Sequence, residues 1–212
     1  MAKETNKQQV FYIHGGEAYS NYEAFLSELK TREIRNLPNS ESLKKWSSSL
    51  AEDLGEDFEV FSPQMPNAMN AKYEEWKIWF ERHFEYLKNE VILVGWSLGA
   101  MFFVRYLSEN ETPFTIKHLF LIAGAYQNID AGKMKEDGGD FFTDSDVIPN
   151  IQYKVDGISI FHSKDDFVVT FEHAEKYKSA LPEATLHAFE TRNHFLIEEF
   201  PELLELIKSV AK

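Results

Sequence analysis

The sequence predicts an α/β fold in which about six mostly parallel strands form one sheet with helices on both faces. Short apolar runs alternate along the chain with longer segments whose apolar residues recur at helical spacing. A helix between successive strands also implies parallel pairing, because two parallel strands need a long crossover connection. With 212 residues, 43% of them hydrophobic, the chain is large enough to bury a substantial core as one domain spanning residues 1–212.

Six runs are expected to be strands, and six segments are expected to be helical. The strands are residues 8–13, 58–61, 91–94, 116–123, 157–161 and 185–189. The helical patterns occupy residues 21–35, 40–54, 73–88, the segment from Leu98 onward, residues 170–180 and the residues from about 199. Ser40 and Thr170 are the expected N-caps of two of these helices, because a hydroxyl accepts a hydrogen bond from an unpaired N–H in the first turn.

The composition excludes several classes of function. A net charge of −13 disfavours binding to nucleic acid, whose phosphates attract basic surfaces, and it also disfavours anionic membranes. The chain has no cysteine, so a thiol nucleophile, a disulfide framework and thiolate metal sites are ruled out. No apolar stretch approaches the length of a secretion signal or a membrane span, and a cytoplasmic location is therefore expected.

The strongest functional signal is the motif Gly95-Trp96-Ser97-Leu98-Gly99, which lies between a predicted strand and a predicted helix. In this context Gly-x-Ser-x-Gly forms a nucleophile elbow, a sharp turn that exposes the serine hydroxyl above the sheet. The helix that begins there directs its unpaired N–H groups and its dipole toward negative charge beside Ser97. Ser97 is therefore the candidate nucleophile.

A serine nucleophile needs a base and a carboxylate that orients the base. Of the seven histidines, His194 is the one that lies in a loop beyond the last predicted strand. Asp165 and Asp166 compete for the acid. The run from Asp165 to Val169 resembles an Asp-x-x-Val-Pro pattern when Asp165 is its first residue, so Asp165 is preferred and Asp166 is the alternative. The resulting order of Ser97, Asp165 and His194 is that of the α/β hydrolases.

The first predicted strand ends at His14-Gly15-Gly16, where glycines let backbone N–H groups approach a ligand closely. In α/β hydrolases a loop at this place supplies one of the two N–H donors that bind the oxyanion. We therefore expect the N–H groups of Gly16 and Leu98 to form the oxyanion hole, since Leu98 follows the nucleophile. The expected architecture is the three-layer α/β-hydrolase fold with a minimal cap.

Residues 126–152 follow the fourth predicted strand and have no clear periodicity. The segment lies where α/β hydrolases commonly carry a lid or a wall of the substrate pocket, and a solvated surface excursion is the alternative. Its acidic residues lack the regular ligand spacing of an EF-hand, so a calcium site is not expected. No metal or cofactor is expected elsewhere in the chain.

These motifs resemble those of the retinoblastoma-binding-protein-nine-like serine hydrolases, which are small α/β hydrolases with little cap. The resemblance runs along nearly the whole chain, and four places carry it: His14-Gly15-Gly16, Pro63 to Pro66 with Trp76, Gly95-Trp96-Ser97-Leu98-Gly99, and Ser163-Lys164-Asp165-Asp166 with Asn193-His194-Phe195. It implies a serine hydrolase that acts on small esters or amides. Two residues depart from the pattern, because His162 stands where glycine is usual and Val169 stands where proline is usual.

Three functions are compatible with this constellation. The first is hydrolysis of a small acyl ester or amide through an acyl-enzyme on Ser97, which requires neither cofactor nor metal. The second is a regulatory protein-binding module that has kept the scaffold without turnover, and the complete set of Ser97, Asp165 and His194 disfavours it. The third is acyl transfer to another acceptor by the same residues. The sequence does not identify a protein partner.

Overall fold

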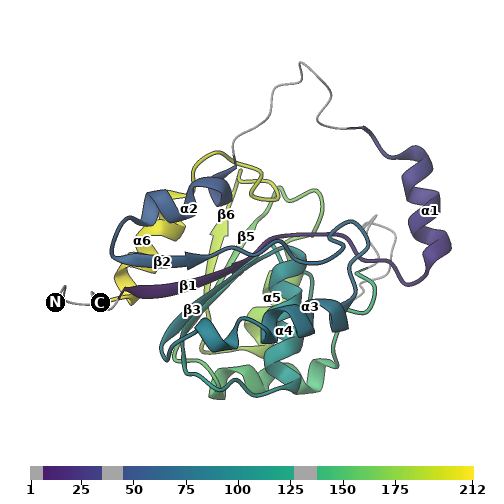
Figure 1. Cartoon of the computed structure of the whole chain (residues 1–212). Helices are drawn as coiled ribbons and strands as arrows, with labels where there is room; N and C mark the ends of the chain where they lie inside the picture. The colour runs from purple at the N-terminus through teal and green to yellow at the C-terminus, as the bar shows by residue number, and fades with distance from the viewer. Residues whose placement is uncertain (1–6, 35–44, 127–137) are drawn as a thin grey trace.

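The computed structural model describes residues 7–34, 45–126 and 138–212, which contain one six-stranded sheet covered by helices on both faces (Figure 1). The strands are β1 (Gln8–Ile13), β2 (Phe58–Phe61), β3 (Val91–Trp96), β4 (Ile116–Ile122), β5 (Ile158–Ser163) and β6 (Thr185–Phe189). They lie in the order β2-β1-β3-β4-β5-β6, and every neighbouring pair is parallel. The predicted strands are confirmed, with small differences in the bounds of β3, β4 and β5.

The helices are α1 (Tyr22–Thr31), α2 (Trp46–Leu54), α3 (Tyr73–Glu81), α4 (Leu98–Glu109), α5 (Glu172–Ala180) and α6 (Pro201–Val210). Short 3-10 helices, η1 (Phe84–Tyr86) and η2 (Ser145–Tyr153), follow α3 and precede β5. The single helix expected over residues 73–88 is therefore divided into α3 and η1.

The two expected N-caps have different outcomes. Ser40 lies outside the described residues, and α2 begins at Trp46. The prediction for Thr170 is wrong: the N-cap residue of α5 is Phe171, which makes no side-chain capping bond. Phe171 already has helical φ and ψ of −56° and −26°, so the Thr170 carbonyl, not its hydroxyl, accepts the N–H of His173 (3.1 Å).

Successive strand residues point to opposite faces of the sheet, and both faces are buried. In β1, Phe11 and Ile13 belong to the core layer that contains α3, α4 and α5. Val10 and Tyr12 belong to the opposite layer, with α2 and α6. Figure 1 shows the same division, with α3, α4 and α5 gathered on one side of the sheet and α2 and α6 on the other. This is the expected three-layer arrangement.

The strand order places the candidate site between β1 and β3. From β1 the chain moves outward to β2, whereas from β3 it moves the opposite way through β4 to β6. Right-handed crossovers in opposite directions put their helices on opposite faces, as observed for α2 and α4. The connections after β1 and β3 therefore diverge, and open α/β sheets bind ligands in the crevice at such a point. Gly15 and Ser97 follow these two strands.

The described part of the expected lid segment packs against the body of the protein. The Phe141 ring is 1% exposed and lies edge-on to Trp76 of α3, with ring centroids 5.0 Å apart. Ile148 of η2 is fully buried in the core layer that contains α4. Residues 127–137 lie outside the described residues, so a lid or pocket-wall role for residues 126–152 stays a prediction.

Helix α1 differs from the other α-helices of the described ranges because none of its residues is buried. Asn21 begins it, and its side chain accepts the N–H of Ala24 (2.8 Å). Figure 1 shows α1 at the side of the molecule farthest from α2 and α6. Among the helices in the described ranges, none combines the length and apolarity needed to cross a membrane.

Candidate active site

Ser97 occupies the turn between β3 and α4 in a backbone conformation that non-glycine residues rarely adopt. Its φ is 55° and its ψ is −118°, and residues in such sparsely populated regions carry about 1–3 kcal/mol of strain. The Ser97 N–H donates to the Ile122 carbonyl at the end of β4 (2.8 Å). Its own carbonyl accepts the N–H of Ala100 in the first turn of α4 (3.0 Å). These bonds tie the strained turn to a strand and a helix.

The two glycines of the motif are required by close contacts between backbones. A Cβ atom at Gly99 would lie 2.3 Å from the carbonyl oxygen of Ile13 in β1. A Cβ atom at Gly95 would lie 2.6 Å from the Gly99 carbonyl oxygen and 2.7 Å from the Ala100 Cα. Any larger residue would push α4 away from the sheet, so the motif spacing reflects the packing of this helix.

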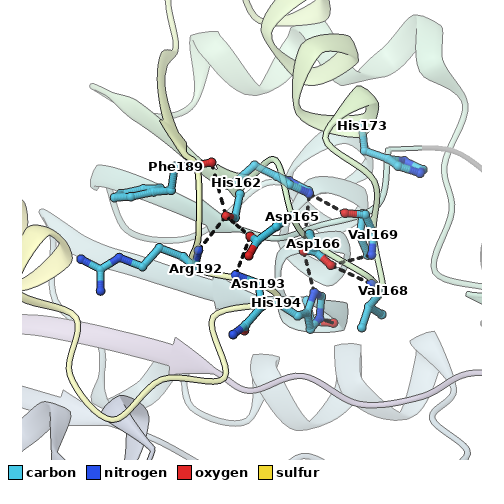
Figure 2. Close-up of polar contacts among 12 residues, drawn as sticks. His162, Asp165, Asp166, Val168, Val169, His173, Phe189, Arg192, Asn193 and His194 are labelled. Carbon is cyan, nitrogen blue, oxygen red and sulfur yellow. Dashed lines mark hydrogen bonds and ion pairs between the residues drawn. The ribbon is translucent and has the colours of Figure 1, made fainter.

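His194 lies in the loop after β6 and faces Ser97. Its Nε2 atom is 3.0 Å from the Ser97 Oγ atom, and its side chain is buried. Its other ring nitrogen, Nδ1, is 2.8 Å from Oδ2 of Asp166 (Figure 2). Because an ionised carboxylate only accepts hydrogen bonds, Nδ1 carries the imidazole proton. Nε2 is then the acceptor for the Ser97 hydroxyl.

Two tryptophan indoles hold the backbone of the histidine loop. Trp96 Nε1 donates to the His194 carbonyl (3.0 Å), and Trp46 Nε1 donates to the Phe195 carbonyl (3.1 Å). Asn193 and Phe195, on either side of His194, have φ values of 43° and 55°. The loop is therefore a strained turn anchored by α2 and β3. Sequence reasoning missed these anchors, although the place of Trp96 beside Ser97 was an available signal.

The carboxylate against His194 belongs to Asp166, and the expectation that Asp165 lies there is wrong. The Asp166 side chain is fully buried, with 0% exposure. Its Oδ1 atom accepts the N–H groups of Val168 (2.8 Å) and Val169 (2.9 Å), while Oδ2 faces His194. Every polar atom of this buried carboxylate therefore has a donor.

The local turn explains why the second aspartate is the one that enters the site. After β5 ends, the Asp166 N–H donates to the Ser163 carbonyl (3.2 Å), which closes a turn that directs Asp166 inward and leaves Asp165 exposed. The Asp-x-x-Val part of the sequence pattern also fits one position later, from Asp166 to Val169. That register identifies the residue in contact with His194, and it places Thr170 where proline is usual.

Asp165 instead connects the acid loop to the histidine loop (Figure 2). Its Oδ1 atom accepts the hydroxyl of Ser163 (2.5 Å) and the N–H of Asn193 (2.8 Å). The hydrogen bond from Ser163 holds the pKa of Asp165 below its usual range. Ser163 Oγ in turn accepts the N–H of Arg192 (2.8 Å). Asp165 thus fixes the approach to His194 without touching the imidazole.

The glycine loop after β1 lies against the elbow. A Cβ atom at Gly15 would be 3.1 Å from the Ser97 Cβ. One at Gly16 would be 3.3 Å from Leu98 Cδ2 and 2.8 Å from the Ala68 carbonyl oxygen. Leu98 opens α4, and the first N–H groups of a helix have no partner within that helix. The structure therefore brings Gly16 and Leu98 together beside Ser97.

Two other histidines, the partly buried His118 and the buried His173, have structural partners away from Ser97. Burial lowers the pKa values of His118 and His173 to about 4, so both are neutral at neutral pH. His118 Nε2 is 2.9 Å from Ser159 Oγ, and His173 Nδ1 accepts the N–H of Tyr126 (2.9 Å). These contacts agree with the sequence-based choice of His194 over the other histidines.

Comparison with known proteins connects this site to a family. The serine hydrolase family matches residues 34–208. The rat protein serine hydrolase RBBP9 is 25% identical over 153 residues, which cover 72% of this chain and 78% of the rat protein. The ydeN gene product of Bacillus subtilis has a TM-score of 0.68 at 19% identity, covering 96% of this chain and 98% of that chain. Naproxen esterase (carboxylesterase NP) from Bacillus subtilis has a TM-score of 0.66 at 10% identity, and the match covers 98% of this chain and 84% of the esterase chain.

The architecture is that of the α/β hydrolases, and the two solved structures share this fold. The chain belongs to the serine hydrolase family, and the resemblance to the retinoblastoma-binding-protein-nine-like hydrolases is confirmed. It is therefore a hydrolase of the α/β-hydrolase superfamily. Because the identities to the solved structures are below 25%, the likeness carries the fold and not their substrates.

Proposed function

We propose that this chain hydrolyses a small acyl ester or amide through a covalent acyl-enzyme on Ser97. One observation carries the proposal: the Ser97 Oγ atom is 3.0 Å from His194 Nε2, and His194 Nδ1 is 2.8 Å from Asp166 Oδ2. A hydroxyl, an imidazole and a carboxylate in this order activate serine for attack on an acyl carbonyl. The acid of the proposed triad is Asp166.

In the proposed reaction, His194 accepts the hydroxyl proton as Ser97 Oγ attacks the carbonyl carbon. Asp166 stabilises the imidazolium, and the N–H groups of Leu98 and Gly16 donate hydrogen bonds to the oxyanion. His194 then gives its proton to the departing alcohol or amine, which leaves the acyl group on Ser97. A water molecule, deprotonated by His194, attacks this ester, releases the carboxylic acid and restores the serine.

Replacing the nucleophile tests this function. Ser97→Ala should lower the hydrolysis of p-nitrophenyl acetate by about 10⁴-fold or more, because the remaining groups cannot form an acyl-enzyme. Initial rates would be compared with those of Ser108→Ala, which removes a buried hydroxyl that donates to the Val104 carbonyl in the same helix. Retention of wild-type turnover by folded Ser97→Ala would remove Ser97 from the mechanism. A wild-type protein that turns over no ester or amide would favour the binding-module alternative.

The adjacent aspartates offer a matched pair of substitutions. Asp166→Asn should reduce kcat by about 10³–10⁴-fold, because a neutral amide neither stabilises the imidazolium nor fixes its tautomer. Asp165→Asn should reduce kcat by less than about tenfold, because an amide oxygen can still accept from Ser163 and Asn193. The measurement is kcat for both variants at one pH, with thermal melts as a check on folding. The reverse ranking would contradict the assignment of Asp166.

A groove beside the glycine loop supports an apolar acyl group in the substrate. It lies between α1 and residues 67–75, and its volume is about 520 Å³, within the range of small-molecule sites. Phe25, Ala68 and Met69 form its apolar wall. The Ala68 carbonyl is the atom that a Cβ at Gly16 would meet, so the groove adjoins the proposed oxyanion hole.

If this groove binds the acyl group, a substitution in its wall should affect long-chain esters more than short-chain esters. Phe25→Ala should lower kcat/KM for p-nitrophenyl octanoate by roughly tenfold, the effect of losing about 1.4 kcal/mol of apolar contact. It should leave p-nitrophenyl acetate nearly unchanged, because an acetyl group is too short to enter the groove. Leu29→Ala is the control, since Leu29 is exposed on the same helix and does not line the groove. Equal losses for both esters, or for both variants, would exclude this subsite.

A further inference from the structure

His162 lies directly behind the carboxylate of Asp166 and is not used by the mechanism above. It is the fifth residue of β5, where the family resemblance leads one to expect glycine. Its side chain is 1% exposed, and that of Asp166 is 0% exposed. Figure 2 shows its imidazole directed at Asp166 and Val169. A histidine buried against a buried carboxylate is costly unless it is hydrogen-bonded there.

The hydrogen bonds define the tautomer of His162. Its Nε2 atom is 2.7 Å from the carbonyl oxygen of Val169. A carbonyl can only accept, so Nε2 carries a proton and donates it. The Val169 N–H donates to Asp166 Oδ1 (2.9 Å), so one residue is bonded both to His162 and to the acid. The imidazole thereby closes the turn that holds Asp166.

The same N–H group also lies close to the charge of the acid. His162 Nε2 is 3.6 Å from Oδ2 of Asp166, which is the oxygen that accepts from His194. This distance is too long for a hydrogen bond but short enough for the N–H dipole to stabilise the negative charge. Two imidazoles therefore face one carboxylate oxygen, one through a hydrogen bond and the other through its dipole.

Burial leaves His162 uncharged at neutral pH, because it lowers the pKa of the imidazole. A charged His194 lowers this pKa further, whereas the hydrogen bond to the Val169 carbonyl and the charge of Asp166 raise it. His173 of α5 interacts electrostatically with His162, and burial keeps His173 neutral as well. Glu172 and Lys176 on the same helix act on His173 with opposite signs. His162 is therefore a neutral donor and not a second base.

We propose that His162 is a positioning residue that fixes the 166–169 turn and weakens the negative charge that Asp166 presents to His194. This inference rests on the proposed function of the Ser97, His194 and Asp166 set. It gives the departure from the family pattern a chemical role, since glycine at this place has neither a side chain to bond Val169 nor a dipole to face Asp166.

A pair of substitutions tests the proposal. His162→Leu fills the space of the imidazole with an apolar side chain and removes the N–H donor. His162→Gln places an amide N–H near the position of Nε2. We expect His162→Leu to lower kcat by about tenfold with KM unchanged. The acid limb of its kcat/KM profile should move to higher pH by roughly half a unit, because the full carboxylate charge then favours the protonated, inactive imidazole. His162→Gln should keep both values close to those of the wild type.

His187→Gln on β6 is the control, since this histidine stacks on Phe161 and has no contact with Asp166. If His162→Leu does not fold, His162→Asn replaces it, because the shorter amide does not reach the Val169 carbonyl. A uniform loss of kcat/KM with an unmoved pH midpoint in both variants would show a merely structural role and overturn the proposal.

The failure of this inference is distinguishable from failure of the proposed function. If turnover depends on Ser97 but neither kcat nor the pH midpoint responds to His162→Leu, the inference alone is wrong. If the wild type shows no turnover, NMR titration of the His194 ring still tests the proposed role of His162. We expect the titration midpoint to move to higher pH in His162→Leu, and an unmoved midpoint would overturn the proposal.

Discussion

The close packing of α4 against β1 and β3 is the constraint on which the candidate active site depends. At Gly99 the helix backbone approaches the Ile13 carbonyl so closely that a Cβ atom would lie 2.3 Å away. A turn between a strand and a helix packed this tightly has no room to relax, and Ser97 therefore adopts a φ of 55°. Burial of nearly the whole of α4 offsets the strain of about 1–3 kcal/mol.

Separate parts of the fold position His194, the proposed base, and Asp166, the proposed acid. Trp46 and Trp96, from opposite ends of the α2–β3 region of the sequence, bind the backbone of the histidine loop. The carboxylate of Asp166 is held by the backbone N–H groups of Val168 and Val169 in its own turn. Asp165 links the two loops through Ser163 and Asn193. The distances among Ser97, His194 and Asp166 thus depend on residues that take no part in the proposed chemistry.

Much of the fold could be predicted because its signals are local. The apolar run before Ser97 and the motif that follows it specify a strand, a turn and a helix within ten residues. Trp76 and Phe80 recur at helical spacing, and both are fully buried. The ends of helices were harder to predict. The Thr170 hydroxyl could cap a helix, but the path of the chain makes the Thr170 carbonyl the acceptor of the His173 N–H.

The sequence did not identify which of the two aspartates, Asp165 or Asp166, contacts His194. Asp165 and Asp166 are chemically identical neighbours, and a turn sends one toward His194 and the other toward Asn193. The hydrogen bond from the Asp166 N–H to the Ser163 carbonyl closes this turn, and it forms where β5 ends. His162 posed a related difficulty, because its role depends on contacts across that same turn.

The most direct test of the central claim is the site at which a fluorophosphonate reacts with the wild-type protein. These reagents form a stable adduct with a serine whose proton is removed by a neighbouring base. Peptide mass spectrometry of the labelled protein should find one adduct, on Ser97, if the strained elbow holds this hydroxyl against His194. An adduct on a different residue, or no adduct on folded protein, would contradict the assignment of Ser97 as the nucleophile.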